Sequence, residues 1–181
     1  ALISEIAMNG LMLNVSPHIS ESGYSTSFAA NISALCMGSL ALGKFLLGEF
    51  YDRMGPERAT VWPYVCTIIG LFGAALARYP VALVPMVCCC GIGGAYGSVG
   101  FPILIRSYYG SRDYGSIYGL VIAVLRLGDM LTPIFMGAVF DAMGTYVPAY
   151  WLMLVTVAVM GVGCILNLQR LEKQMPTLEA R

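Results

Sequence analysis

Four ionisable residues lie within otherwise apolar stretches of the 181-residue chain, namely Glu5, Lys44, Arg126 and Asp129. A charged side chain in apolar surroundings is costly, so such a residue is expected either to pair with an opposite charge or to serve a ligand. A basic side chain placed there attracts carboxylates, because electrostatic attraction is stronger where water is excluded. A carboxyl side chain in the same surroundings can carry a proton. These four residues therefore mark either a ligand pathway or pairs of opposite charge, and because their charges sum to zero they do not by themselves select an anion.

Arg126 and Asp129 are three residues apart, so both side chains share one face of a helix and can pair. Arg126 lies roughly 13 Å into an apolar stretch that begins near Ile117, close to the depth of a bilayer midplane. Two interpretations stay open. The two residues are either an internally neutralised pair that fixes helix packing, or a site in which Arg126 binds a substrate carboxylate while Asp129 tunes it or carries a proton.

Lys44 lies about two helical turns before Asp52, roughly 10 Å from the end of its apolar stretch. Its long stem can reach a membrane interface, so a snorkelling or locally paired lysine is one interpretation and a carboxylate ligand is the other. Glu5 is either a proton site facing a cavity or a residue near the cut start of a first helix. The chain begins without an initiator methionine, and we expect its first helix to be the outer part of a truncated one.

Three uncharged residues, Tyr96, Tyr118 and Asn31, are candidates for lining a small cavity, since a phenol or an amide orients a ligand without adding charge. Interhelical contacts or anchoring at the membrane interface are the alternative roles. The single histidine, His18, lies in a polar, turn-rich stretch and is expected to be a solvated loop residue without a metal or catalytic partner. We expect no cofactor and no metal, because none of the cysteines has zinc-like spacing; they are Cys36, Cys66, Cys88, Cys89, Cys90 and Cys164.

The composition is that of a membrane protein. Hydrophobic residues make up 58% of the chain, charged residues only 11%, and the mean hydropathy is +0.75, whereas a soluble domain is nearer a quarter charged. The composition and the lack of catalytic groups argue against a soluble enzyme, and the net charge of zero argues against a nucleic-acid partner. The chain is therefore expected to be all-α and polytopic, with the lipid bilayer as a partner.

Apolar runs of about 20 residues, the length that crosses a bilayer, set the expected helices. We expect one partial and five full transmembrane helices joined by short loops, with residues 1–170 forming one transmembrane unit and residues 171–181 a cytoplasmic tail. The expected loops are at residues 16–25, 49–58, 78–80, 106–115 and 141–146. The expected helices cover residues 1–15, 28–47, 59–77, 81–105, 117–140 and 147–168.

Cations are distributed unequally between the two sets of alternating loops. By the positive-inside rule the cation-rich side is cytoplasmic, so the C-terminus is expected inside, in a plasma or bacterial inner membrane. The opposite loops hold only Arg78. The cation-rich loops and tail hold Arg53, Arg58, Arg106, Arg112, Arg170, Lys173 and Arg181.

The charged loop at residues 49–58 carries a recognisable spacing. Its residues Gly48, Asp52, Arg53, Gly55 and Arg58 match the pattern G-x-x-x-D-R-x-G-x-x-R/K, so this segment resembles the cytoplasmic signature loop of the major facilitator superfamily. Further stretches resemble the C-terminal half of the oxalate/formate antiporter and monocarboxylate-porter branch. They are GLMLNVSPHISESGYS at residues 10–25, LGKFLLGEFYDRMG at 42–55, RSYYGSRDYGSIYGL at 106–120 and VFDAMGTYVPAY at 139–150.

This resemblance implies a six-helix half of a twelve-helix transporter, with the N-terminal six-helix half as its missing partner. It implies secondary active transport of a small carboxylate by alternating access, with the signature loop controlling the switch between states. Lys44 stands four positions before Gly48, where the branch commonly places a basic residue, usually arginine, that holds the substrate carboxylate. Arg126 lies on a helix that also carries a basic residue in oxalate transporters. The alternative is a non-transporting membrane module, such as a sensor or assembly subunit, built from half a transporter.

Overall fold

The structure is a computed structural model that describes residues 2–110 and 113–174, with side chains described from residue 6 to 163 except residues 57, 111 and 112. The described residues contain helices and no strand, so the expected all-α fold is confirmed. The helices are α1 (Leu2–Glu21), α2 (Thr26–Ala59), α3 (Val61–Ala75), α4 (Pro80–Ala95), the π-helical turn η1 (Tyr96–Gly100), α5 (Phe101–Tyr109), α6 (Tyr114–Met143) and α7 (Val147–Gln174).

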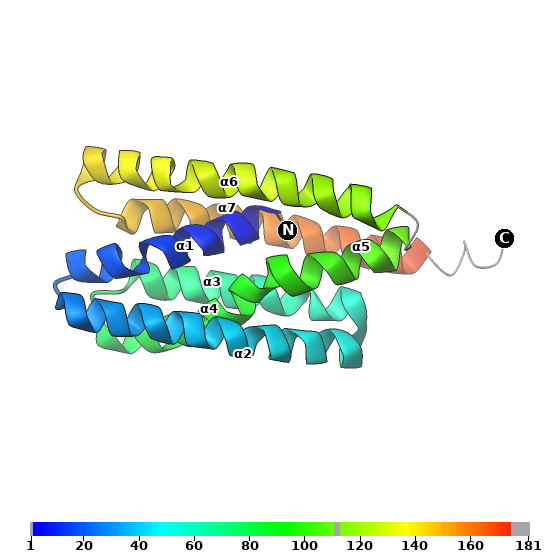
Figure 1. Cartoon of the computed structure of the whole chain (residues 1–181), viewed down its shortest axis with the longest axis horizontal. Coiled ribbons are helices and arrows are strands. Elements are labelled where there is room, and N and C mark those ends of the chain that lie inside the picture. Colours follow the sequence, from blue (N-terminus) through cyan, green and yellow to red (C-terminus); the bar gives the residue numbers. More distant parts are fainter. Residues whose placement is uncertain (1, 111–112, 175–181) are drawn as a thin grey trace.

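The helices lie alongside one another as a bundle (Figure 1). Taken as one bent rod, α4, η1 and α5 form a single passage, so the described chain runs along the bundle six times. The α1–α2, α3–α4 and α6–α7 connections gather at one end, here called the His18 end, and the α2–α3 and α5–α6 connections gather at the other, the Asp52 end. Helix α1 contacts α2 as well as α6 and α7, so it lies between α2 and the α6–α7 pair.

Among the described residues, three helical stretches are long and apolar enough to cross a membrane: Thr26–Pro56, Pro80–Tyr109 and Tyr114–Met143. Helix α3 is apolar but shorter, and the part of α7 whose side chains are described, Val147–Gly163, is apolar as well. The expected boundaries of α3, of the α4–α5 passage and of α6 lie within four residues of the observed ones, whereas α1 and α2 continue past their expected ends. Helix α6 ends at Gly144, whose φ of +69° is readily adopted only by glycine.

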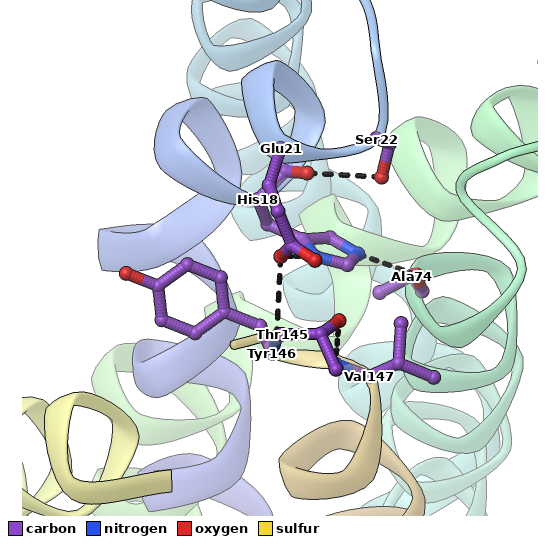
Figure 2. Close-up of polar contacts among 7 residues, drawn as sticks. All are labelled: His18, Glu21, Ser22, Ala74, Thr145, Tyr146 and Val147. Carbon is purple, nitrogen blue, oxygen red and sulfur yellow. Dashed lines mark hydrogen bonds and ion pairs between the residues drawn. The ribbon is translucent and has the colours of Figure 1, made fainter. Parts of the chain in front are cut away.

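The expectation of a loop over residues 16–25 is wrong at its start. Helix α1 continues to Glu21, and only residues 22–25 connect it to α2. His18 therefore lies in the last helical turn, where its side chain is 1% exposed instead of solvated. The imidazole Nε2 lies 2.7 Å from the Ala74 carbonyl oxygen of α3 (Figure 2), and this buried hydrogen bond compensates the polar ring for lost water.

The charged segment at residues 49–58 is a sharp kink and not an open loop. Helix α2 continues through it to Ala59, interrupted only at Gly55, whose φ is +78°. The backbone resumes helical geometry at Pro56, which suits a first helical turn because it has no N–H to leave unpaired. The Thr60 hydroxyl donates to the Pro56 carbonyl at 2.6 Å and meets the Tyr51 hydroxyl at 2.9 Å, closing the turn into α3.

Candidate functional site

A cavity of about 220 Å³ opens between α1, α2, the α4–η1 junction and α6. It brings together four of the residues predicted to form a site, Lys44, Tyr118, Arg126 and Asp129. They come from two helices, because α2 supplies the lysine and α6 supplies the other three. The remaining lining residues are Asn9, Leu40, Gly94, Gly97, Ser98, Ile122 and Leu125.

Asp129 is held on both sides in this cavity, because each of its carboxylate oxygens accepts a hydrogen bond. Arg126 Nη1 donates to Oδ2 at 3.0 Å, and Asn9 Nδ2 donates to Oδ1 at 3.0 Å. The first bond links neighbouring turns of α6, whereas the second ties α6 to α1. The expected pairing of Arg126 with Asp129 is confirmed, and the carboxylate is also an interhelical contact.

The two partners in the ion pair differ in exposure. The Arg126 side chain is 73% exposed and the Asp129 side chain 17%. A guanidinium carries five N–H donors, and the bond to Asp129 uses one of them. Arg126 can therefore keep Asp129 and still offer donors to a second anion.

The charged groups of the cavity do not balance. Lys44 and Arg126 contribute two positive charges and Asp129 one negative charge, so the lining carries one excess positive charge. Lys44 is exposed and lies on α2, whereas the ion pair lies on α6. An arrangement of two cations and one carboxylate around a small cavity favours a monoanion.

Small residues of the α4–η1 passage leave room for this cavity. Gly94, Gly97 and Ser98 form its wall where the helix passes through the π-helical turn. Gly93 and Gly97, which are spaced four residues apart as in a GxxxG pair, have two different roles. A Cβ on Gly93 would lie 2.9 Å from the Thr67 hydroxyl oxygen, so Gly93 permits close packing on α3, while Gly97 faces the cavity.

Two predicted site residues, Tyr96 and Asn31, do not line the cavity. Tyr96 is buried between the rings of Tyr64 and Phe101, with ring centroids 5.8 Å and 4.9 Å away. Asn31 is exposed on α2, nearer the His18 end. Glu5 lies in α1, but its side chain is outside the described residues.

Asn9 is the cavity residue that sequence reasoning missed. Asn9 lies in an apolar helix, where an amide removed from water needs hydrogen-bond partners. Its position in the sequence could therefore have indicated a polar contact with another helix. Its neighbour Asn14 shows why that indication is ambiguous. The Asn14 side chain donates to the Gly10 carbonyl of its own helix at 2.9 Å and makes no link to α6 in the described contacts.

The signature residues lie apart from the cavity, toward the Asp52 end of α2. Gly48 is half-buried, while Asp52, Arg53 and Arg58 are exposed. Arg53 pairs with Glu49 one turn earlier on the same helix, and exposed pairs of this kind contribute little stability. These residues therefore form no part of the cavity lining, and Lys44, two turns along α2, is the point at which this helix enters the cavity.

The sequence was compared with protein families, curated proteins and solved structures. The profile of the Major Facilitator Superfamily matches residues 1–180. No curated protein and no solved structure matches the chain. The apolar helices and the signature spacing agree with this family match, which covers nearly the whole chain. The chain therefore belongs to the Major Facilitator Superfamily, a family of integral membrane transporters.

Proposed function

We propose that this transporter carries a small carboxylate, of the size of oxalate, formate or lactate, by secondary active transport with alternating access. The observation that supports the proposal is the excess positive charge of the cavity, because Lys44 and Arg126 both line this space of about 220 Å³. That volume suits an anion of a few heavy atoms. Tyr118, in the same wall, adds a hydroxyl that can orient the anion without changing the charge.

In the proposed mechanism the substrate carboxylate binds the free N–H donors of Arg126 and the ammonium group of Lys44. The entering negative charge competes with Asp129 for Arg126. If Asp129 takes a proton when a monoanion such as formate, lactate or singly protonated oxalate binds, the charge of the occupied cavity equals that of the empty one, which couples a proton to the substrate. Asp129 is therefore the proposed proton site. Glu5, one helical turn before Asn9, is a second candidate on the same helix.

Alternating access requires a second six-helix unit against which this bundle rocks, and we propose that the cavity is completed by such an N-terminal half. In this proposal the Asp52 end faces the cytoplasm, as the positive-inside rule predicts from the distribution of cations. There Gly48, Asp52, Arg53, Gly55 and Arg58 would control switching, with Gly55 supplying the kink. Tyr96 and Asn31 are not included in the proposed site, because neither lines the cavity.

A ligand-binding screen tests this proposal directly. A ligand that binds the folded state raises the temperature of unfolding, and the shift grows with ligand concentration. We expect oxalate and formate to stabilise the purified protein, and the neutral amides oxamide and formamide, which are close in size, to have no effect. Equal stabilisation by acids and amides, or stabilisation by neither, would contradict a carboxylate site.

Asn9→Leu is expected to slow carboxylate transport about tenfold. The substitution removes the donor to Asp129 Oδ1, and a hydrogen bond to a charged group contributes about 1.5 to 3 kcal/mol. The freed carboxylate then competes more strongly with substrate for Arg126. Asn14→Leu is the matched control, since it makes the same change in the same helix and breaks only a bond within α1. Equal rates for the two variants in a transport assay would remove Asn9 from the site.

A further inference from the structure

His18, the buried histidine in the last turn of α1, has a fixed tautomer, and its second ring nitrogen makes no hydrogen bond in the described part of the chain. His18 Nε2 lies 2.7 Å from the Ala74 carbonyl oxygen, which can only accept, so Nε2 carries the proton. Nδ1 is buried and has no hydrogen-bond partner among the described residues. A buried nitrogen of this kind is an unmet acceptor in the neutral ring and becomes a second donor if the ring is protonated.

The nearest charged group to Nδ1 is the Glu21 carboxylate, one turn further along α1. Glu21 Oε2 lies 3.7 Å from His18 Nδ1, too far for a hydrogen bond. The same oxygen accepts a hydrogen bond from the Tyr146 backbone N–H at 3.1 Å, as Figure 2 shows. Glu21 therefore fastens the end of α1 to the turn between α6 and α7.

Among the described residues, no further charged group is recorded in contact with the ring. Helix α3 presents the Ala74 carbonyl, the turn between α6 and α7 presents the phenol ring of Tyr146, and α7 presents that of Tyr150, with centroids 6.2 Å and 4.6 Å from the imidazole. Arg78 lies beyond Glu21, where both line a cavity of about 490 Å³. Glu21 thus stands between the buried ring and a space large enough to hold water.

We propose that His18, Glu21 and the Tyr146 amide form a proton-responsive latch, in which protonation of His18 at Nδ1 releases the Tyr146 amide from Glu21. Two routes lead to the same release. Either Glu21 Oε2 moves toward the new Nδ1–H donor to form an ion pair, or the charged imidazole becomes hydrated through the adjoining cavity and the last turn of α1 separates from α7. The Tyr146 hydrogen bond weakens in both cases.

The direction of the pH effect follows from burial. His18 lies level with the connecting loops, outside the three candidate spans. Burial lowers the pKa of its imidazole, and the hydrogen bond to Ala74 and the nearby Glu21 carboxylate oppose this only in part. A conformation in which the ring is hydrated therefore binds the proton more tightly than the closed one, so acid shifts the population toward the open latch. The latch is closed at neutral pH and opens as the pH falls below the usual range of histidine.

This latch acts on the helix that carries Asn9. Nine residues, or about 14 Å of helix, separate Asn9 from His18. A change at the His18 end therefore reaches the cavity through α1, whichever ligand the cavity binds. The latch itself makes no use of Lys44, Arg126 or Asp129, so it stands or falls independently of the proposed carboxylate transport.

The chain contains one histidine, which makes a spectroscopic test unambiguous. The protein, labelled with ¹⁵N and ¹³C in histidine and tyrosine and placed in lipid nanodiscs, is titrated from pH 8 to pH 4.5 while the imidazole nitrogens and the Tyr146 amide are followed by NMR. We expect both signals to change with the same midpoint, and hydrogen exchange at Tyr146, corrected for its intrinsic pH dependence, to become at least tenfold faster below that midpoint.

Two variants separate the latch from general acid effects. His18→Gln keeps an N–H donor for Ala74 and cannot titrate, so Tyr146 should stay protected at every pH. Glu21→Gln keeps a weaker acceptor without charge, so Tyr146 should exchange faster than in the wild type at neutral pH. The proposal is overturned if His18 does not titrate in this range, if it titrates without a response at Tyr146, or if His18→Gln keeps the response.

Discussion

Arg126→Ala is expected to reduce carboxylate transport by roughly 10- to 100-fold. A hydrogen bond to a charged group contributes about 1.5 to 3 kcal/mol, and the variant removes the donors that the substrate would use. It also leaves Asp129 without the ion pair that Arg126 provides. Lys44→Arg keeps a cation in the cavity and adds a planar fork suited to carboxylates, so its rate should stay within a few-fold of the wild type.

Uptake by both variants is measured in liposomes at matched protein density. An unpaired Asp129 can destabilise the fold, so expression and unfolding temperature are measured in parallel. The double variant Arg126→Ala/Asp129→Asn has no unpaired carboxylate at residue 129, so a loss of transport in it does not result from the destabilising effect of that charge. Small and similar effects of Arg126→Ala and Lys44→Arg would take both residues out of the site.

Gly43→Ala is expected to cost about 3 kcal/mol of stability, the upper part of the range for overpacking. A Cβ on Gly43 would overlap the Gly91 carbonyl group, because α2 and α4 meet there backbone to backbone. A rigid backbone cannot move aside as a flexible side chain can, so the two helices must separate. We expect the unfolding temperature of the purified chain to fall by about 5 to 10 °C.

Gly38→Ala is the matched control for Gly43→Ala. Gly38 lies five residues earlier in the same helix, and no atom lies within 4 Å of a Cβ built there. Alanine is about 1 kcal/mol better than glycine within a helix, so this variant should be neutral or slightly stabilised. A loss of stability in Gly38→Ala as large as in Gly43→Ala would contradict the close contact between α2 and α4.

The helices and the family were predictable from the sequence, because both depend on local patterns. Apolar runs of spanning length fixed the helix positions, and the spacing of Gly48, Asp52, Arg53 and Gly55 indicated the superfamily that the family comparison confirms. The pairing of Arg126 with Asp129 was also predictable, since residues three apart on a helix share a face. The carboxylate branch, the membrane orientation and the role of the signature residues in switching stay predictions.

The features that could not be predicted from the sequence depend on contacts between distant parts of the chain. The polar stretch around His18 resembles a loop, and only the Ala74 carbonyl, 56 residues away, explains why the ring is buried. Tyr96 was a candidate for the cavity with interhelical contact as the alternative, and the choice could not be made because the π-helical turn that begins there has no periodicity in the sequence; the ring packs in the core. Asn9 was overlooked because its partner is Asp129 on α6, a contact across 120 residues.

Counterflow is the most direct test of the central claim that this cavity transports small carboxylates. The full gene product is reconstituted into liposomes loaded with unlabelled oxalate or formate, and entry of the labelled anion is followed over time. We expect a transient accumulation of label that disappears in Arg126→Ala and is preserved in Lys44→Arg. No substrate-dependent flux with oxalate, formate or lactate would contradict the account and would favour a membrane module that does not transport.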